Sequence, residues 1–251
     1  MFSSFTTPTR TYALKVEKFV CNKFGIAEFF ARSISTTPIT CGIKVLDVGC
    51  GVGPLMILLS DQYKTLTTGV ELNSVACKCC RANLKSIGLT ASTTVFEGPL
   101  TAFAQTYPTE KFDLIVSNPP LNENITAEEI AFYNAKGFSE PNCDTFSYMT
   151  NSWHDEDGHD LLDQIFAYAI RHLEPNGAVA IAFCEIDGAN ITSIISKARK
   201  SGFQIVNSIS GNISPISIGA ERIQSSNIIT HYAVFKRNPC YGNQDLQGTR
   251  E

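Results

Sequence analysis

The stretch from Lys44 to Pro54, with the sequence KVLDVGCGVGP, constrains the fold more than any other part of the chain. An apolar run reaches an acid at Asp47, a glycine-rich turn follows, and a second apolar run begins after Pro54. This order predicts a strand, a tight turn and a helix. Pro54 suits the first helical position, where its missing N–H costs nothing. Ligands of open α/β sheets bind at the carboxyl ends of such strands, so we expect a cofactor at this turn.

The residues in and after this turn distinguish between two classes of cofactor. The spacing is Gly-x-Gly-x-Gly, and Pro54 stands where a dinucleotide fingerprint has glycine or alanine. A carboxylate at Asp47 would repel a pyrophosphate, but it can face an ammonium group directly or through water. Glu71 ends a second apolar run about twenty residues on and can accept two ribose hydroxyls. Together these residues favour S-adenosyl-L-methionine over NAD.

From residue 44 onwards, predicted strands and helices alternate. We expect strands at Lys44–Val48, Thr67–Glu71, Thr93–Phe96, Phe112–Ser117, Ala178–Cys184, Phe203–Ser210 and Asn227–Phe235. We expect helices at Pro54–Gln62, Ser74–Ile87, Leu161–His172 and Ala189–Ser201. This alternation predicts an α/β fold, a mostly parallel sheet with helices on both faces.

The ends of the chain are predicted to lie outside this domain. Residues 1–40 are expected to form a loose Ser/Thr-rich tail, up to Arg10, and a short helical cap between Tyr12 and Ile34. Residues 41–237 are predicted to form the main domain, and residues 238–251 a polar tail.

Three motifs carry a family resemblance: VLDVGCGVG at 45–53, GVELN at 69–73 and DLIVSNPP at 113–120. They resemble class I S-adenosylmethionine-dependent methyltransferases, and among these the HemK/PrmC or "methyltransferase small" group. That group modifies glutamine side-chain amides or the exocyclic amines of nucleic-acid bases. The resemblance covers roughly Cys41 to Phe235. It implies a Rossmann-like sheet of seven strands, in which the last strand runs antiparallel beside the fifth, and an N-methyltransferase activity.

The resemblance also implies the site residues. Catalysis is assigned to Asn118, Pro119 and Pro120. The Asn118 side-chain oxygen and the Pro119 carbonyl would each accept one N–H of the target nitrogen, so that its lone pair faces the sulfonium methyl. The predicted cofactor-binding residues are Asp47, Gly49, Cys50, Gly51, Gly53, Glu71, Leu72, Glu97, Gly98 and Asn118. The predicted substrate contacts are Leu121 and Trp153.

Two positions depart from the family pattern. Pro99 stands where relatives commonly place an Asp against the adenine amine, so either Glu97 or a backbone carbonyl would accept from adenine. Leu121 stands where relatives usually have an aromatic ring that stacks on a planar target. The sequence leaves open whether these changes alter specificity or remove activity.

Several acceptors and functions therefore stay open. Protein glutamine is preferred over nucleic-acid adenine, with a small-molecule acceptor as a third option. A nicotinamide oxidoreductase on a similar sheet is disfavoured by Asp47 and Pro54. A non-catalytic subunit that binds a protein partner is disfavoured by Asp47, Glu71 and Asn118.

Composition narrows the partners further. The formal net charge is −4, so bulk charge does not favour nucleic-acid binding. No apolar run approaches the eighteen or so residues of a membrane span. Nine scattered cysteines, an odd number, favour reduced thiols and a cytoplasmic location. Cys77, Cys79 and Cys80 lack a second Cys/His pair at zinc-ligand spacing, so we expect no metal site.

Overall fold

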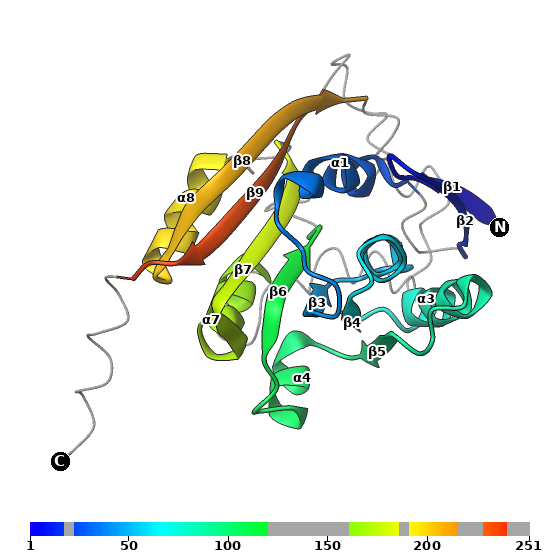
Figure 1. The fold of residues 1–251 in the computed structure, drawn as a ribbon, viewed down its shortest axis with the longest axis horizontal. Helices are drawn as coiled ribbons and strands as arrows, with labels where there is room; N and C mark the ends of the chain where they lie inside the picture. The colour runs from blue at the N-terminus through cyan, green and yellow to red at the C-terminus, as the bar shows by residue number, and fades with distance from the viewer. Residues whose placement is uncertain (18–22, 120–160, 186–190, 215–227, 240–251) are drawn as a thin grey trace, which may run out of the picture.

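The computed structural model describes residues 1–17, 23–119, 161–185, 191–214 and 228–239 (Figure 1). Seven strands form one sheet in the order β5-β4-β3-β6-β7-β9-β8. Their bounds are β3 Lys44–Val48, β4 Leu66–Glu71, β5 Thr93–Glu97, β6 Phe112–Ser117, β7 Leu173–Cys184, β8 Phe203–Ile213 and β9 Ile228–Arg237. Pairing is parallel from β5 to β7, whereas β9 runs antiparallel to both β7 and β8. The α/β fold class and the antiparallel last strand beside the fifth are confirmed.

Helices cover both faces of the sheet (Figure 1). One face carries α1 Gly25–Ser33, α2 Pro54–Ile57 and α3 Ser74–Ile87, and the other carries α4 Leu100–Thr106, α7 Leu161–His172 and α8 Ile191–Lys200. Side chains of a strand alternate between the two faces. Accordingly Val45 packs into the core under α1 to α3, and its neighbour Leu46 packs into the core under α4, α7 and α8. None of the helices in the described ranges combines the length and apolar character that a membrane crossing requires.

The predicted bounds hold best where a local signal marks the end of an element. Helix α3 matches the prediction because Asn73 caps it: the Asn73 Oδ1 accepts the N–H groups of Val75 and Ala76 at 2.9 and 3.2 Å. Gly88 ends it in a left-handed conformation, φ 81°. Strands β3 and β6 and helix α7 also match. Helix α4 was not predicted.

The helix predicted at Pro54–Gln62 is divided in two. The α-helical turn α2 stops at Ile57, and the π-helical turn η2, Leu58–Gln62, continues it. π-Helical turns are rare and often stand at functional sites. Strand β7 begins earlier than predicted, at Leu173, which pairs with Phe112 of β6. The register then shifts, and Leu114 of β6 pairs with Ala178, so residues 174–177 form an irregularity between the two pairs.

The prediction for the first residues is wrong. Residues expected to form a tail and the start of a helix form a hairpin, β1 Phe2–Thr6 and β2 Thr11–Lys15. In β2 the buried residues Tyr12 and Leu14 alternate with exposed ones, a period of two that suits a strand. The helical part of the region is limited to α1 and the 3₁₀ turn η1, Ile34–Thr36.

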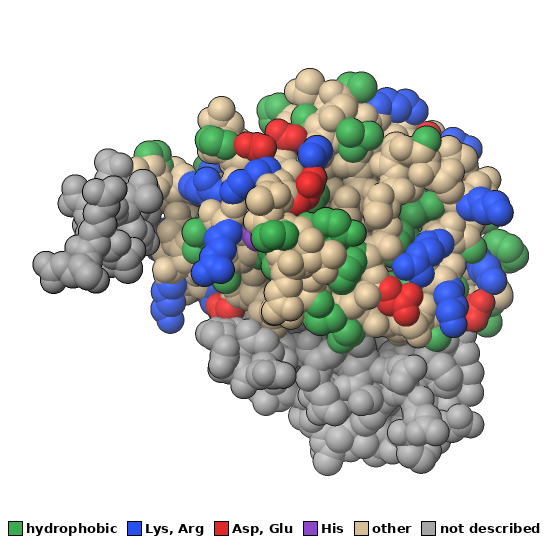
Figure 2. All heavy atoms as spheres, turned by 90° about the horizontal axis from the view of Figure 1, so that it is seen from below, with side chains coloured by type: hydrophobic (Ala, Val, Ile, Leu, Met, Phe, Trp, Pro, Cys, Tyr) green, Lys and Arg blue, Asp and Glu red, His purple; other side chains and the backbone are tan. Residues whose placement is uncertain are grey.

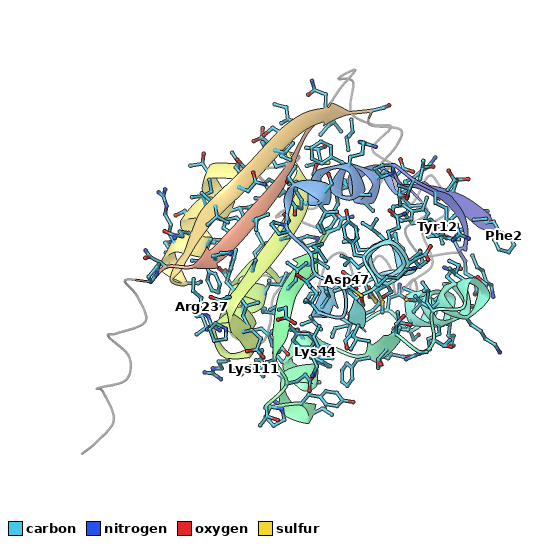
Figure 3. The ribbon with its side chains drawn as sticks, in the orientation of Figure 1. Phe2, Tyr12, Lys44, Asp47, Lys111 and Arg237 are labelled. Atoms are coloured by element: carbon cyan, nitrogen blue, oxygen red, sulfur yellow. The ribbon has the colours of Figure 1, made fainter. Side chains whose placement is uncertain are left out.

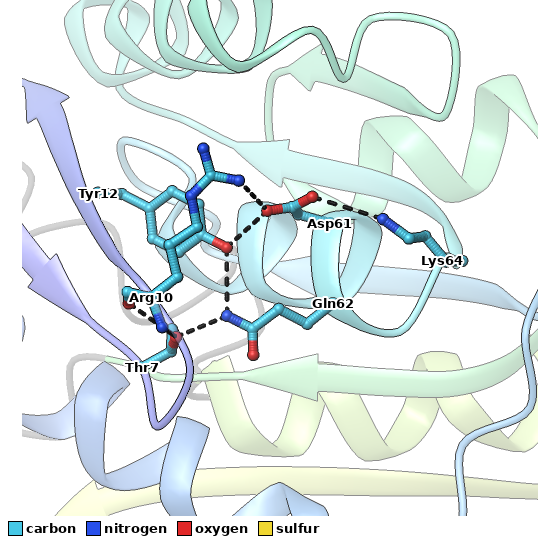
Figure 4. Close-up of polar contacts among 6 residues, drawn as sticks. All are labelled: Thr7, Arg10, Tyr12, Asp61, Gln62 and Lys64. Carbon is cyan, nitrogen blue, oxygen red and sulfur yellow. Dashed lines mark hydrogen bonds and ion pairs between the residues drawn. The ribbon is translucent and has the colours of Figure 1, made fainter.

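The hairpin is bound to the helical segment that follows the glycine turn (Figure 4). Asp61 Oδ2 accepts hydrogen bonds from Arg10 Nη1 at 3.0 Å and from the Tyr12 hydroxyl at 2.7 Å. Gln62 Nε2 donates to Thr7 Oγ1 at 2.5 Å. The Tyr12 hydrogen bond, aided by nearby cations, holds the pKa of the Asp61 carboxyl below its usual range. The first residues are therefore an integral part of this layer of the fold.

Two basic side chains, Arg237 and Lys111, cap the carboxyl end of α7 (Figure 3). Arg237 Nη2 donates to the carbonyls of Ala169, Ile170 and Leu173 at 3.1, 3.0 and 2.6 Å. Lys111 Nζ donates to the carbonyl of Arg171. Carbonyls at a helix end lack helical partners and carry partial negative charge, so cations stabilise them.

We predict that Arg237→Ala lowers the free energy of unfolding by about 1–3 kcal/mol, because it leaves partly buried carbonyls without donors. Urea denaturation of the variant and the wild type measures the difference. Lys236→Ala is the matched control, since Lys236 is exposed on the same strand. Equal unfolding free energies for the two variants would contradict the assignment.

Candidate functional site

Four parallel strands end at one edge of the sheet and bring the predicted residues together. Val48 at the end of β3 is paired with Val70 in β4 and with Ser117 in β6. Glu71 at the end of β4 is paired with Glu97 of β5. The residues that follow these strand ends, among them Gly49 and Asn118, therefore lie along the same carboxyl edge.

The glycine turn after β3 needs glycine for two different reasons. Gly49, Gly51 and Gly53 have φ of 73°, 55° and 91°, which disfavours any residue with a Cβ. A Cβ at Gly53 would also approach the Cys80 sulfur to 2.7 Å. At Gly49 and Gly51, in contrast, a Cβ would meet no atom of the described residues within 4 Å. Among these residues the backbone of the turn is thus open to close approach by a ligand.

Glu71 holds the turn from the end of the neighbouring strand. Its carboxylate is buried; Oε2 accepts the Gly51 N–H at 2.8 Å, and Oε1 accepts the Asn73 N–H at 2.8 Å. A carboxylate has about four acceptor positions. These two backbone amides fix the carboxylate of Glu71 at the carboxyl edge, between the glycine turn and the start of α3.

Asp47 is the most unusual group at this edge. Its side chain is 1% exposed, and neither carboxylate oxygen has a hydrogen-bond partner among the described residues. Burial, reinforced by the charge of Glu71, raises the pKa of Asp47 to about 8. A buried polar group without a partner is rare and calls for an explanation. A cationic ligand group would satisfy this carboxylate.

Asn118 presents a second buried acceptor next to it. Ser117 Oγ donates to the Val48 carbonyl at 2.7 Å and joins the end of β6 to the end of β3. The following Asn118 has a buried Oδ1 with no hydrogen-bond partner among the described residues. Pro119 is buried beside it. The ends of the paired strands β3 and β6 thus each carry a buried acceptor for which the described residues provide no donor.

The other predicted cofactor-binding residues differ in their contacts and exposure. The Gly98 N–H donates to the Glu71 carbonyl at 2.9 Å, so the loop after β5 is joined to β4. Glu97 forms an ion pair with Arg81 at 3.1 Å, and Leu72 is 41% exposed.

Part of the predicted site lies outside the described residues: Pro120, Leu121 and Trp153. Within the part of the chain that is described, no group of three or more His, Cys, Asp and Glu side chains could hold a metal ion.

Sequence reasoning missed two residues at this site, Asn73 and Asn83. Asn73 stands directly before α3, and the preference for Asn at a helix start could have identified it. Asn83 lies inside α3, and its side chain bonds to the Val52 carbonyl of the glycine turn at 3.0 Å. No sequence signal marks a polar residue in the middle of a helix as a contact of this kind.

Comparison with known proteins agrees with the geometry. Residues 27–135 match the family model of the methyltransferase small domain. The release factor glutamine methyltransferase of Gloeobacter violaceus is 27% identical over 182 residues, which cover 70% of this chain and 56% of that protein. The tRNA1(Val) (adenine(37)-N6)-methyltransferase of Aeromonas hydrophila is 32% identical over 146 residues, 57% of this chain and 52% of that protein. The chain thus spans about half the length of these two relatives, and the resemblance expected from the motifs is confirmed.

A similar fold occurs in a solved structure. A SAM-dependent methyltransferase from Thiobacillus denitrificans, crystallised with S-adenosyl-L-homocysteine, has a TM-score of 0.50 and 12% identity. The match covers 80% of this chain and 87% of that one. At this identity the likeness concerns the fold alone.

We predict that Asp47→Asn stabilises the protein increasingly as the pH rises. The folded wild type binds a proton up to a pKa of about 8, whereas unfolded Asp loses it near pH 4. Between these values wild-type stability falls by roughly 1.4 kcal/mol for each pH unit, and the Asn variant lacks this loss. Urea unfolding of both proteins at pH 5, 6, 7 and 8 measures the difference. A difference that is constant across this range would show that Asp47 titrates normally.

Proposed function

We propose that this chain, which matches the methyltransferase small domain over residues 27–135, is an S-adenosylmethionine-dependent methyltransferase that acts on nitrogen. The observation that carries the proposal is the buried Asp47 carboxylate, which has no hydrogen-bond partner among the described residues and stands just before a glycine turn that none of them crowds at Gly49 and Gly51. A cation is the natural partner of such a carboxylate. S-adenosylmethionine has an ammonium group on its amino-acid end, and it supplies a methyl group on a positively charged sulfur.

Two carboxylates would hold opposite parts of this cofactor. Asp47 would face the ammonium group, directly or through a water molecule, and Glu71 would accept the two ribose hydroxyls. The Gly51 and Asn73 amides already fix the orientation of the Glu71 carboxylate, so little ordering is required on binding. The glycine backbone would lie against the cofactor between these two contacts.

Asn118 and Pro119 would orient the acceptor nitrogen. An amide or aryl amine is a weak nucleophile because its lone pair is delocalised. The Asn118 Oδ1, which lacks a donor among the described residues, and the Pro119 carbonyl can accept the two N–H groups and direct the lone pair toward the methyl group. The same acceptors stabilise the positive charge that develops on the nitrogen during transfer. After the methyl group has moved, the cationic nitrogen would release one N–H proton to water, and the electrons of that bond would remain on nitrogen.

The side-chain amide of a protein glutamine is the preferred acceptor. The glutamine methyltransferase from Gloeobacter violaceus matches a larger share of this chain than does the tRNA adenine methyltransferase from Aeromonas hydrophila. The net charge of −4 provides no general attraction for RNA. On the face shown in Figure 2, basic and acidic side chains are interspersed.

Methylation of defined acceptors tests the preference. Purified release factor and unmodified tRNA are each incubated with the protein and methyl-labelled S-adenosylmethionine, and the modified residue is identified by mass spectrometry. Methylglutamine in the release factor supports the preferred acceptor. Methyladenine in the tRNA would instead assign the nucleic-acid base.

We predict that Glu71→Gln weakens binding of S-adenosyl-L-homocysteine by roughly tenfold or more, since the amide nitrogen cannot accept from Gly51 and a ribose hydroxyl. Isothermal titration calorimetry measures the affinity, with NADH titrated in parallel. Glu110→Gln, an exposed change at the partner of Lys44, is the control. Binding of NADH in place of S-adenosyl-L-homocysteine would overturn the proposed cofactor.

We predict that Asn118→Ala removes at least 99% of methyl transfer, while the affinity for S-adenosyl-L-homocysteine changes less than about threefold. The variant loses an acceptor that acts on the substrate nitrogen and leaves Asp47 and Glu71 intact. Single-turnover methylation and calorimetry separate the two effects. Turnover at the wild-type rate would contradict the role of Asn118.

A further inference from the structure

The end of the hairpin and the glycine turn are joined by one side chain, Asn83 of α3. Its Nδ2 donates to the Val52 carbonyl in the turn at 3.0 Å and to the Lys15 carbonyl of β2 at 3.1 Å. Its Oδ1 accepts the Lys15 N–H at 2.6 Å. Asn83 is 2% exposed, and the three contacts use both N–H donors of its amide. The amide therefore bridges two segments that are far apart in sequence.

A second group of contacts joins the hairpin to η2, at the end of the helical segment that follows the glycine turn. The chain from the glycine turn runs through α2 into η2, where Asp61 and Gln62 bind Arg10, Tyr12 and Thr7 (Figure 4). Apolar side chains of the hairpin and of the glycine turn and its helix belong to the same buried core. Those of the hairpin are Phe5, Tyr12, Leu14 and Val16, and those of the turn and helix are Val52, Leu55, Met56 and Leu59. The hairpin is thus attached to both ends of the segment that would carry the cofactor.

We propose that docking of the hairpin, residues 1–16, raises the affinity of the cofactor site. Asn83 is the positioning residue that links the hairpin to the glycine turn. This inference rests on the proposed function, because it concerns the affinity of the same site for S-adenosylmethionine. Asn83 acts through the Val52 carbonyl and needs no contact with the cofactor. When the hairpin is docked, Asn83 is held by Lys15 and fixes the turn in the conformation in which Glu71 holds Gly51.

Docking of the hairpin and binding of the cofactor are thermodynamically linked. If hairpin docking favours the binding conformation of the turn, bound cofactor must stabilise the docked hairpin by the same free energy. The amide of Lys15 is the most direct reporter, since it donates to Asn83. A purely structural asparagine would support the fold equally with and without cofactor.

Hydrogen–deuterium exchange of the full chain, with and without saturating S-adenosyl-L-homocysteine, tests this coupling. In the wild type we expect exchange of residues 2–16 to slow at least threefold when the ligand is added. In Asn83→Ala we expect this protection of the hairpin to disappear. Calorimetry on the same variant should show a roughly tenfold weaker affinity, the effect of losing the hydrogen bonds that hold the bound conformation.

Two control variants separate this coupling from general destabilisation. Ser86→Ala changes the same helix, where the Ser86 hydroxyl donates to the Asn83 carbonyl at 2.8 Å, and leaves the Asn83 side chain unchanged. Arg237→Ala destabilises the distant end of α7. Both should bind S-adenosyl-L-homocysteine with wild-type affinity at a temperature at which all variants are folded.

The possible outcomes are distinct. Hairpin exchange in the wild type that does not respond to the ligand would overturn the inference, even if Asn83→Ala failed to fold. Unchanged affinity of a folded Asn83→Ala would overturn it as well. In both cases binding to the wild type would leave the proposed function intact. A wild type that binds no S-adenosyl-L-homocysteine would overturn the proposed function, and this inference with it.

Discussion

The hydrogen bond from the Gly51 amide to the Glu71 carboxylate is the contact on which the site depends. It draws the turn after β3 toward the end of β4, while the Gly49 and Cys50 amides bond to the Val70 carbonyl. The Gly53 amide bonds back to Cys50. Because these amides donate to Glu71, Val70 and Cys50, none of them donates to the Asp47 carboxylate. The arrangement that orders the turn therefore also leaves a buried carboxylate in need of a ligand.

The sequence predicted the elements of the sheet well because their ends carry local chemistry. Gly88 and the residue before Ser74 mark the two ends of α3, and Asp47 and Glu71 end strands that are otherwise apolar. The hairpin was missed because β2 is short and its apolar residues lie close to those of α1 in sequence. Its contacts are long-range: β2 packs against α3, β1 packs against α1, and Asp61 binds Arg10 and Tyr12. The alternation in β2 covers only five residues, and contacts between residues some fifty positions apart cannot be read from it.

The site was predictable to a similar extent and for similar reasons. Residues that follow strand ends could be assigned to one edge from the rule that parallel strands present their carboxyl ends together. The burial of Asp47, the raised pKa that results and the ion pair of Glu97 with Arg81 depend on neighbours that only the fold brings near. Asn83 shows the same limit, since its partners Lys15 and Val52 belong to segments that are far from it in sequence.

The position of β9 has a consequence for how the chain is made. This strand is the last of the sheet in sequence, yet it lies between β7 and β8 and pairs with both. Both β7 and β8 are synthesised before β9, and until β9 is in place β7 lacks its neighbour on one side and β8 lacks the strand with which it pairs. Exposed strand edges promote association with other chains. Since β9 is the only link between β7 and β8 in the described sheet, this half of the sheet cannot assemble until residues 228–237 are available.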